Sequence, residues 1–539
     1  MDQKPTLKPP IKLSNFTQAL LHNFSLIQKK VQSHDLSKIV VSQTVSFFAI
    51  VYEKIRNAVE YREEHLIRRA AIERVLKRKL ALNPQGKGEA ENLLREMLWA
   101  RYFPNGSLGT TEMDLTQKLI DQYVSIRNAL LTGQTSEKKG YYSQFLFDLL
   151  TCEIEESLSM EEAKKNSLFT FYIYQVLRNK IKVEGLTDDQ KDALFYVAVE
   201  RGYAKNDLAY LRYHLFTLSY NSFTSLNPDE LKSLIPKLSA MFERIDGFIK
   251  NPQVERLIRY ARSQIPPFTI LFEIIKRHPE NVTAILANKD KLWTEVEQIC
   301  REKYQQTGTR LRNVAIKSLI YIFLTKMLFV LILEYPLSLY FYNEVSFFSI
   351  GINTIFPPLL MLFIVGLVRV PGEDNTRRIS ERIIDIEDAD KSFETSLAYI
   401  LRKPRVRRPL LIFGFTVFYS LTFIITLALI YALLNVLYFN LISQLIFIFF
   451  VSVVSFFGFR VRQIAKEFQL RVSESFFSPF VDFFFMPILS LGKFFSTEIA
   501  KLNFFIVILD FLIEAPFKLI FEVVEEWISF VKARKEEII

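Results

Sequence analysis

The sequence predicts an all-α fold, that of a multi-pass α-helical membrane protein with a large soluble all-helical region at its N-terminus. Three observations predict it. Four stretches after residue 314 carry few or no charges and are long enough to cross a bilayer. Before that position charged residues dominate and show helical periodicity. The 539 residues include 50 Phe but only 16 Gly, which favours helices packed by large side chains over β-rich folds with many tight turns.

Residues 1–313 are predicted to form a cytoplasmic all-helical region. Thr187–Gln190 and Ser159–Glu162 are capping-box patterns, which satisfy the first backbone N–H groups of a helix. Pro228 follows Asn227 and suits the first position of a helix. No alternating β-strand pattern is evident. Breaks fall at 83–88, 103–110 and 132–140, and the last would divide the region into two subdomains.

A transmembrane helix needs about 20 mostly apolar residues, because a rise of about 1.5 Å per residue has to cover about 30 Å of hydrocarbon. Four stretches satisfy this length: Ala315–Phe341, Phe347–Val370, Pro409–Tyr438 and Leu441–Phe459. The sequence therefore predicts transmembrane helices 1 and 2 within 314–370 and helices 3 and 4 within 409–459.

Lys and Arg residues flank these stretches at alternate ends. They occur before the first span, in the loop 402–408 and after the fourth span, whereas the loops around Asn343 and Asn440 carry none. The positive-inside rule then places the N-terminus and the loop 402–408 in the cytoplasm. We expect no cleaved signal peptide. The predicted location is an integral membrane position, in the cytoplasmic membrane if the protein is bacterial.

The segment 371–408 is predicted to be a cytoplasmic amphipathic helix with a heptad-like apolar seam. Its spacing alternates between four and three residues, with one acidic interruption. The seam is a candidate interaction surface for the soluble half or for a second copy, and docking within one chain is the more economical interpretation. Its residues are Ile379, Ile383, Ile386, Phe393, Leu397 and Ile400.

Two charged residues lie inside the first predicted span. Lys326 and Glu334 are eight residues apart on roughly one face. Their separation along a straight helix is about 12 Å, so we do not expect them to pair with each other. An ionisable group in hydrocarbon needs a partner or a water path. Each therefore has a structural or snorkelling role, or else lines a pathway.

The segment 460–539 is predicted to form membrane-embedded or interfacial amphipathic helices. Asp482 lies between two prolines in a very apolar stretch, where a broken or in-plane helix is favoured. Asp510, Glu514 and Lys518 recur every four residues in another apolar stretch, facing water at the interface or lining an aqueous cavity. Four spans are the favoured count, and six are the alternative if 476–521 crosses the bilayer.

No constellation typical of an enzyme is found, so an enzymatic function is not favoured. Gly86–Gly88 lacks the pattern of a phosphate-binding loop, and the five histidines form no metal-binding motif. Cys152 and Cys300 have neither metal nor disulfide spacing. We therefore expect no catalytic residue, no cofactor and no metal site.

Two charged segments have a bland and a functional interpretation. The helix predicted over 61–80 is rich in Arg and Lys, so it is either a solvated face or a surface for anionic lipid or nucleic acid. Interleaved Glu residues favour the solvated face. A second group can bind a cation or form a solvated acidic face, and the solvated face is favoured. It consists of Glu153, Glu155, Glu156, Glu161 and Glu162.

The favoured function is that of a membrane-anchored interaction or assembly protein with a cytoplasmic helical domain. The alternative is a transporter or channel that uses the intramembrane charges Lys326, Glu334, Asp482, Asp510 and Glu514. The net charge of +10 favours contact with anionic lipid at the cytoplasmic face. The expected partners are thus the lipid bilayer and a protein partner or a second copy, with no nucleic acid.

Overall fold

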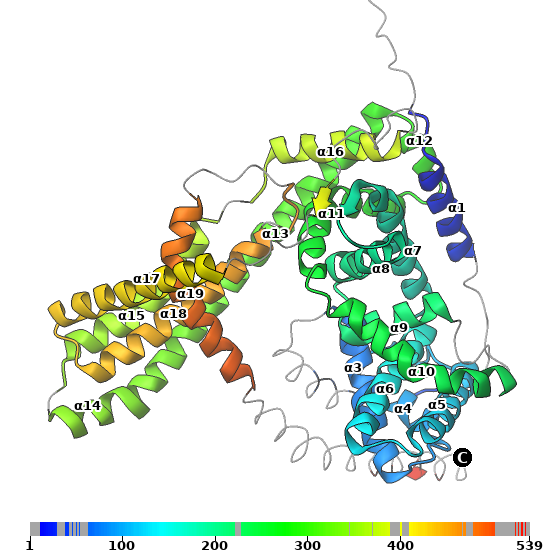
Figure 1. The fold of residues 1–539 in the computed structure, drawn as a ribbon, viewed down its shortest axis with the longest axis horizontal. Helices are drawn as coiled ribbons and strands as arrows, with labels where there is room; N and C mark the ends of the chain where they lie inside the picture. The colour runs from blue at the N-terminus through cyan, green and yellow to red at the C-terminus, as the bar shows by residue number, and fades with distance from the viewer. Residues whose placement is uncertain are drawn as a thin grey trace, which may run out of the picture. The chain divides into compact units, whose positions relative to one another are not determined.

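The computed structural model is almost entirely helical (Figure 1). It describes residues 11–29, 38–42, 46, 50, 53, 63–220, 228–343, 345–368, 370–388, 399–401, 409–465, 467–470, 478–501, 523, 527, 530, 531 and 534. These residues divide into two compact units. Unit 1 contains the described residues of 1–13, 266–393 and 402–505, and unit 2 contains those of 14–265, 394–401 and 506–539.

Unit 2 is a helical body around a core of aliphatic and aromatic side chains. At its centre Phe145 stacks on Phe242, with ring centroids 3.9 Å apart. The breaks expected from the sequence fall at the connections between α3, α4, α5 and α6. The helices are α1 (Asn15–Lys29), α3 (Glu64–Leu82), α4 (Glu89–Trp99), α5 (Thr110–Leu131), α6 (Ser136–Leu158), α7 (Met160–Leu177), η1 (Arg178–Lys180), α8 (Asp188–Val199), η2 (Glu200–Ala204), α9 (Leu208–Ser219), α10 (Pro228–Ile249) and the first part of α11 (Val254–Arg277).

The two predicted capping boxes have different outcomes. Thr187 caps α8, since its hydroxyl accepts a hydrogen bond from the Gln190 N–H. Ser159 precedes α7 without capping it. Its hydroxyl donates instead to the backbone carbonyl and the carboxylate of Glu155, at 2.8 and 2.9 Å. The second capping prediction is therefore wrong, because a buried carboxylate takes the hydroxyl.

A short parallel sheet corrects the expectation that the chain has no strands. Strand β1 (Ile181–Val183) pairs with β2 (Tyr399–Leu401). Three residues are too few to give an alternating pattern in the sequence. Because β2 contains Ile400, this residue of the predicted heptad seam belongs to a strand, and its side chain is exposed. The described helix that carries the start of the seam ends at Glu387.

Unit 1 contains the helices that are long and apolar enough to cross a membrane. There are four such segments among the described residues: Lys289–Tyr342, Phe347–Gly366, Pro409–Val436 and Leu441–Ala465. They coincide with the four predicted stretches except that the first begins much earlier. The elements are α12 (Val282–Leu286), α13 (Lys289–Phe329), η4 (Val330–Glu334), α14 (Tyr335–Tyr342), α15 (Phe347–Gly366), α16 (Glu373–Glu387), α17 (Pro409–Val436), α18 (Leu441–Ala465) and α19 (Ser478–Lys501).

Helix α13 runs without interruption through residue 313. The composition changes at this position, but the helix does not end there. Asn288 caps its start by accepting from the N–H groups of Asp290 and Lys291. The division into compact units falls instead within α11, between residues 265 and 266.

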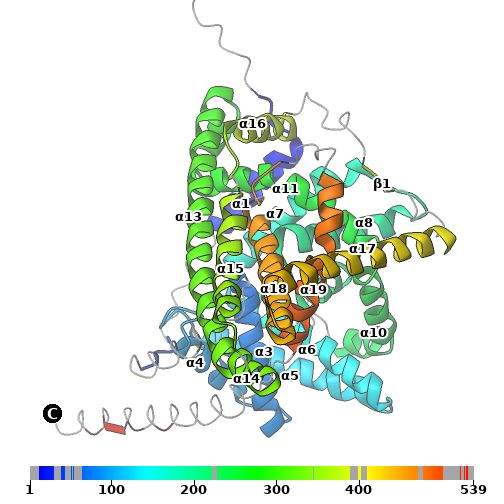
Figure 2. The same ribbon diagram turned by 90° about the vertical axis from the view of Figure 1, so that its left-hand side faces the viewer.

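The apolar helices of unit 1 pack closely around α18. Helices α13, α15 and α18 run side by side (Figure 2). Helix α19 crosses α18 at Gly492, where an added Cβ would lie 2.0 Å from the Ser452 carbonyl oxygen. It continues as one helix through Pro487, so a break at this proline, which the sequence suggested, is not present.

Candidate functional site

The first apolar segment contains a buried ion pair. The Lys326 Nζ atom lies 3.0 Å from Glu334 Oε2, and both side chains have no exposed surface. The expectation that these two residues cannot pair is therefore wrong. Eight steps of regular α-helix overshoot two turns by about 80°. The π turn η4 holds more residues per turn and removes part of this excess.

Neighbouring helices complete the surroundings of the pair. Asn353 of α15 donates to Glu334 Oε1 at 2.7 Å and to the Ser443 carbonyl of α18 at 3.2 Å. The ammonium group of Lys326 lies 4.8 Å from the centroid of the Phe450 ring, a cation–π distance. Three helical segments thus hold one ion pair, and Asn353 links them.

A layer of polar side chains extends from this pair toward the connection between α17 and α18. Asn440 donates to the Ser338 hydroxyl at 2.9 Å, and Ser349 donates to the Tyr438 carbonyl at 3.0 Å. Gln444 donates to Asn435 and to the Phe439 carbonyl. We call these side chains the polar layer: Ser338, Ser349, Asn353, Asn435, Asn440, Ser443 and Gln444.

The other candidate charges are described only in part. Asp482 lies on α19, and its side chain is outside the described residues, as are Asp510, Glu514 and Lys518 altogether. The convergence of all these charges on one cavity is therefore a prediction that stays open.

The seam on 371–408 is divided in the structure. Ile379, Ile383 and Ile386 are buried on α16, whereas Phe393 and Leu397 lie outside the described residues. Helix α16 packs on α13, and its Asn375 donates to the Tyr304 hydroxyl at 2.8 Å. The described part of the seam is therefore covered within one chain.

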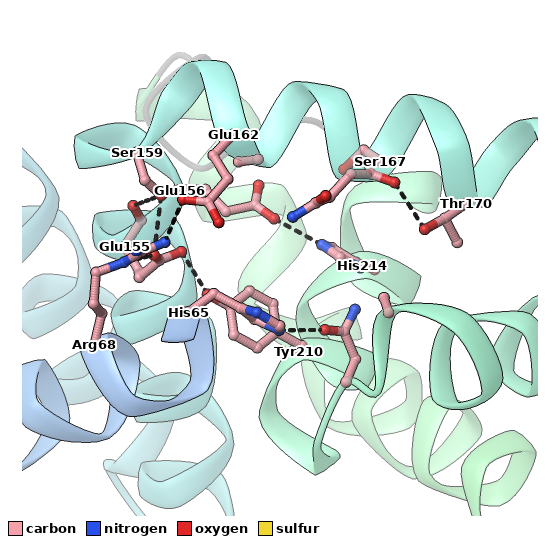
Figure 3. Close-up of a pocket in the computed structure, with 14 residues that line it drawn as sticks. His65, Arg68, Glu155, Glu156, Ser159, Glu162, Ser167, Thr170, Tyr210 and His214 are labelled. Carbon is pink, nitrogen blue, oxygen red and sulfur yellow. Dashed lines mark hydrogen bonds and ion pairs between the residues drawn. The ribbon is translucent and has the colours of Figure 1, made fainter. Parts of the chain in front are cut away.

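Unit 2 contains a buried charged network that sequence reasoning missed. Figure 3 shows its cavity, lined by side chains of α3, α6, α7 and α9. Arg68 donates to Glu155 at 2.6 Å and to Glu162 at 2.9 Å, and Tyr210 donates to Glu155 at 2.6 Å. The cavity volume is about 30 Å³, room for about one or two water molecules. It is too small for an organic substrate.

His214 connects two carboxylates in this network. Its Nε2 atom lies 2.8 Å from Glu156 and its Nδ1 atom 3.0 Å from Glu200. Burial would lower the pKa of His214, but the two carboxylates outweigh it and raise the pKa well above its ordinary value. Burial would raise the pKa of Glu200, but the charge and hydrogen bonds of His214 lower it. The histidine and Glu200 therefore form a charged pair at neutral pH.

These contacts correct two sequence interpretations in part. The acidic group is a solvated face only in part, since Glu153 and Glu155 are buried while Glu162 is half exposed. Glu153 accepts a hydrogen bond from Tyr123 at 2.7 Å. The basic helix also turns Arg68 and Arg69 inward, toward carboxylates. The available signal was the coexistence of an acidic and a basic helix in one part of the sequence, but it does not identify which residues pair.

An open depression of about 560 Å³ lies beside this network in unit 2. Arg69 pairs with Glu73 and Asp207, both at 2.9 Å. Lys205 and Glu63 form a 2.8 Å pair at its border and remain half exposed. Its charged lining residues are Glu63, Arg69, Glu73, Asp148, Lys205, Asp207 and Arg212.

The two cysteines and the clusters of acidic side chains are the remaining groups that could bind a metal ion. Among the described residues, no group of three or more His, Cys, Asp or Glu side chains could hold a metal ion. Cys152 and Cys300 are free and buried. Burial raises the pKa of Cys152 well above its ordinary value and that of Cys300 to about 11, which keeps both thiols unreactive.

No family model, no curated protein and no solved structure matches this chain.

Proposed function

We propose that this chain is an integral membrane protein with four transmembrane helices that holds unit 2 at the cytoplasmic face as an interaction or assembly module. The observation that carries the membrane assignment is the inverted polarity of unit 1. The exposed side chains of its apolar helices are large and apolar, whereas Lys326, Glu334 and Asn353 are fully buried. Soluble helices have the opposite arrangement.

Helix α17 exposes large apolar side chains along its whole length. Leu410 is 82% exposed and Val436 is 74% exposed, at its two ends, and large apolar side chains between them are exposed as well. Leaving such a side chain in water costs about 1.5–3 kcal/mol relative to burying it. Soluble monomers rarely expose apolar patches of more than a few hundred Å². A bilayer removes this cost.

Sidedness is proposed from the charges of the connections. The ends of α14 and α17 lead into connections without Lys or Arg, whereas Arg460 and Arg462 lie at the other end of α18. The positive-inside rule then places α16 and unit 2 in the cytoplasm and the residues around Val345 and Leu441 on the opposite side.

Cysteine accessibility tests this topology in the full chain. The two native cysteines are buried, so the background of labelling is low. In intact cells a membrane-impermeant maleimide is expected to modify Val345→Cys and Leu441→Cys. Asp188→Cys and Glu373→Cys should react only after permeabilisation. Extraction of the protein by alkaline carbonate, or labelling of all four sites in intact cells, contradicts the proposal.

An assembly function is supported by the surfaces that remain available for binding a partner. The described seam of α16 is already packed within the chain, which leaves unit 2 as the surface for a partner. Its open depression has a volume in the range of ligand and side-chain pockets. Paired arginines hold its floor in a fixed shape.

Charge reversal at the border of this depression tests the assembly function. Glu63→Lys in the full chain is expected to reduce chemical cross-linking to a membrane-associated partner, with no change in unfolding temperature. Glu255→Lys is the matched control, because Glu255 is also an exposed partner in an ion pair, with Arg201. Equal cross-linking by both variants contradicts a role of the depression.

The second candidate function is transport or ion conduction through the apolar bundle. One observation favours it, the fully buried pair Lys326 and Glu334, because intramembrane charges are often part of ion or solute pathways. Neutralising Asp510 and Glu514 together is expected to abolish flux in proteoliposomes. Absence of flux in the wild-type protein, with folding intact, contradicts this candidate.

A further inference from the structure

The interior of unit 1 is asymmetric along its helices. On one side of the ion pair the polar layer leads toward the ends of α14 and α17. On the other side the described helices close on an apolar cluster, where the buried polar side chains are hydroxyls such as those of Thr307, Ser318 and Ser455. The cluster consists of Leu311, Ile322, Met361, Val454, Val461 and Ala465. The ion pair therefore has a polar approach from one end only.

Two oxygen atoms in this approach have no hydrogen-bond partner. They are Asn353 Oδ1 and Gln444 Oε1, and both side chains are buried. The NH₂ group of Asn353 is already used by Glu334 and by the Ser443 carbonyl. A buried amide oxygen without a donor costs about 1–3 kcal/mol, so these oxygens are free to accept a bond from water or from an ammonium group.

We infer that Glu334 is a proton-binding site that is reached through the polar layer, from the end of the bundle where α14 and α17 end, and that its protonation transfers the Lys326 ammonium group to Asn353. The ligand is a proton, carried by water that the unpartnered amide oxygens hold. The apolar cluster blocks access from the other end.

The step is balanced in atoms and charge. A proton from the approach adds to a carboxylate oxygen of Glu334, and no covalent bond other than this O–H forms or breaks. The neutral carboxyl group no longer holds Lys326 by charge. The ammonium group then needs an acceptor, and Asn353 Oδ1 belongs to the side chain that already bonds to Glu334. The net charge of the site rises by one.

Lys326 is the charged neighbour of Glu334 in the helices that surround this carboxylate. Within 318–343, 345–366 and 409–459 the sequence contains no Asp, Glu, Lys or Arg besides these two. The printed contacts of Glu334 are with Lys326 and Asn353, while α18 brings Ser443 and the Phe450 ring to the same place.

Sided labelling of Glu334 in sealed vesicles tests the inference. A hydrophobic carbodiimide modifies protonated carboxyl groups within a membrane, and mass spectrometry quantifies the adduct at Glu334. Acidifying the side of Val345 and Leu441 is expected to raise labelling by about tenfold per pH unit above the midpoint. Acidifying the opposite side should leave it unchanged. The inference is overturned by equal responses from both sides, or by labelling that does not depend on pH.

Two variants of one position separate the acceptor role from folding. Asn353→Leu removes the acceptor for Lys326 together with the hydrogen bond that Asn353 donates to Glu334, so it is expected to move the pH needed for labelling. Asn353→Asp adds a second carboxylate and should raise that pH by about one unit or more, because a nearby like charge favours protonation. Thr354→Val is the matched control, since the hydroxyl of Thr354 donates within its own helix to Ile350. A midpoint that is the same in all three variants overturns the inference.

The inference rests on the proposed membrane topology, but the two fail differently. Extraction of the chain from the membrane by alkaline carbonate contradicts the proposed topology. A chain that stays in the membrane, with the expected cysteine accessibility but unsided labelling of Glu334, sinks only the proton site.

Discussion

Arg212 shows how unit 2 arranges buried charge. Its guanidinium group donates to Asp246 at 2.8 and 2.7 Å and to Asp148 at 2.7 Å. It also lies 4.6 Å from the centroid of the Phe145 ring. A buried ion pair adds little to stability in itself, but the loss of one partner leaves uncompensated charge in a low dielectric. The main role of Arg212 is therefore to neutralise two buried carboxylates, and the net attraction between the charges is less important.

The substitution Arg212→Met is expected to lower the free energy of unfolding by about 3–5 kcal/mol, because Asp148 loses its cation and Asp246 keeps only Lys250, 2.9 Å away. Arg201→Met is the control. Arg201 pairs with Glu255 at the surface, where an ion pair contributes about 0–1 kcal/mol. Urea unfolding of the full chain in detergent measures both. Losses of equal size would contradict the role assigned to Arg212.

Glu387, at the end of α16, gives a pH-dependent prediction. Its side chain is fully buried, neither carboxylate oxygen has a hydrogen-bond partner, and burial raises its pKa well above the ordinary value. A folded pKa above the unfolded one means that its contribution is fully present below about pH 4.3 and is lost as pH rises toward the folded pKa. The loss amounts to about 1.4 kcal/mol per pH unit.

Glu387→Met should remove this pH dependence and stabilise the protein at neutral pH. Unfolding temperature measured against pH tests it. The wild type is expected to lose stability from mildly acidic to neutral pH, while the variant shows a smaller change. Parallel curves would show that Glu387 does not titrate in this interval.

Individual partners were beyond the reach of the sequence. Glu155 is contacted by Arg68 across 87 residues and by Tyr210 across 55 residues. Local patterns extend over one or two helical turns, so a cluster of Glu in such a window is indistinguishable from a solvated face. Lys326 and Glu334 could be selected because a charge inside an apolar run is visible locally. Their pairing could not, since it depends on a π turn.

At the scale of elements, the apolar helices were the most predictable part. The predicted stretch Phe347–Val370 corresponds to α15, Pro409–Tyr438 to α17 and Leu441–Phe459 to α18, with differences of a few residues at the ends. Length and the absence of charge identify such helices without tertiary information. The strand β2 and the end of α16 depend on pairing with distant residues, and the heptad pattern wrongly extended that helix.

The crossing of α18 and α19 depends on one glycine. Gly492→Ala is expected to weaken the packing of these helices, because the new Cβ would lie 2.0 Å from the Ser452 carbonyl oxygen. Gly414→Ala on α17 is the control, since no atom lies within 4 Å of its added Cβ, and alanine favours a helix. Thermal unfolding in detergent should show a loss for Gly492→Ala and no loss for Gly414→Ala. Equal tolerance would contradict the crossing.

The ion pair that closes η4 is expected to respond to substitution as a unit. Lys326→Met or Glu334→Met alone should each cost about 3–5 kcal/mol, because one buried charge remains unpaired. The double variant should be closer to the wild type than either single variant. A double-mutant cycle of thermal or denaturant stability in detergent measures this coupling. Additive losses would show that the two residues do not interact.

At the scale of the whole molecule, the chain consists of two compact units with different interiors. Unit 2 has an apolar core with charged networks between its helices, and unit 1 has large apolar side chains on its exposed surface. The sequence anticipated two regions but placed their border at the change in composition near residue 313. The border by contacts lies near residue 265, because α13 carries a polar segment and an apolar segment in one helix.

Such a chain should not unfold in a single step. In detergent, urea is expected to unfold unit 2 first, while detergent-covered apolar helices persist. Arg212→Met should shift the first transition alone, and Gly492→Ala the second alone, so each variant serves as the other's control. Circular dichroism follows both transitions, and tryptophan fluorescence, to which Trp99 of unit 2 contributes together with Trp293 and Trp527, supplements it. A single transition moved by both variants would contradict independent units.

The π turn η4 has a consequence for how this chain tolerates changes in length. A π turn accommodates a surplus residue in an otherwise α-helical segment. Removing one residue from Val330–Leu333 would restore regular winding and leave Glu334 seven α-helical steps after Lys326, about 20° short of two full turns. Glu334 would then stay on the side of the helix that carries Lys326. The same deletion elsewhere in α13 would rotate the two ends of the helix by about 100° relative to one another, so η4 is the place where this helix can lose one residue and keep the ion pair.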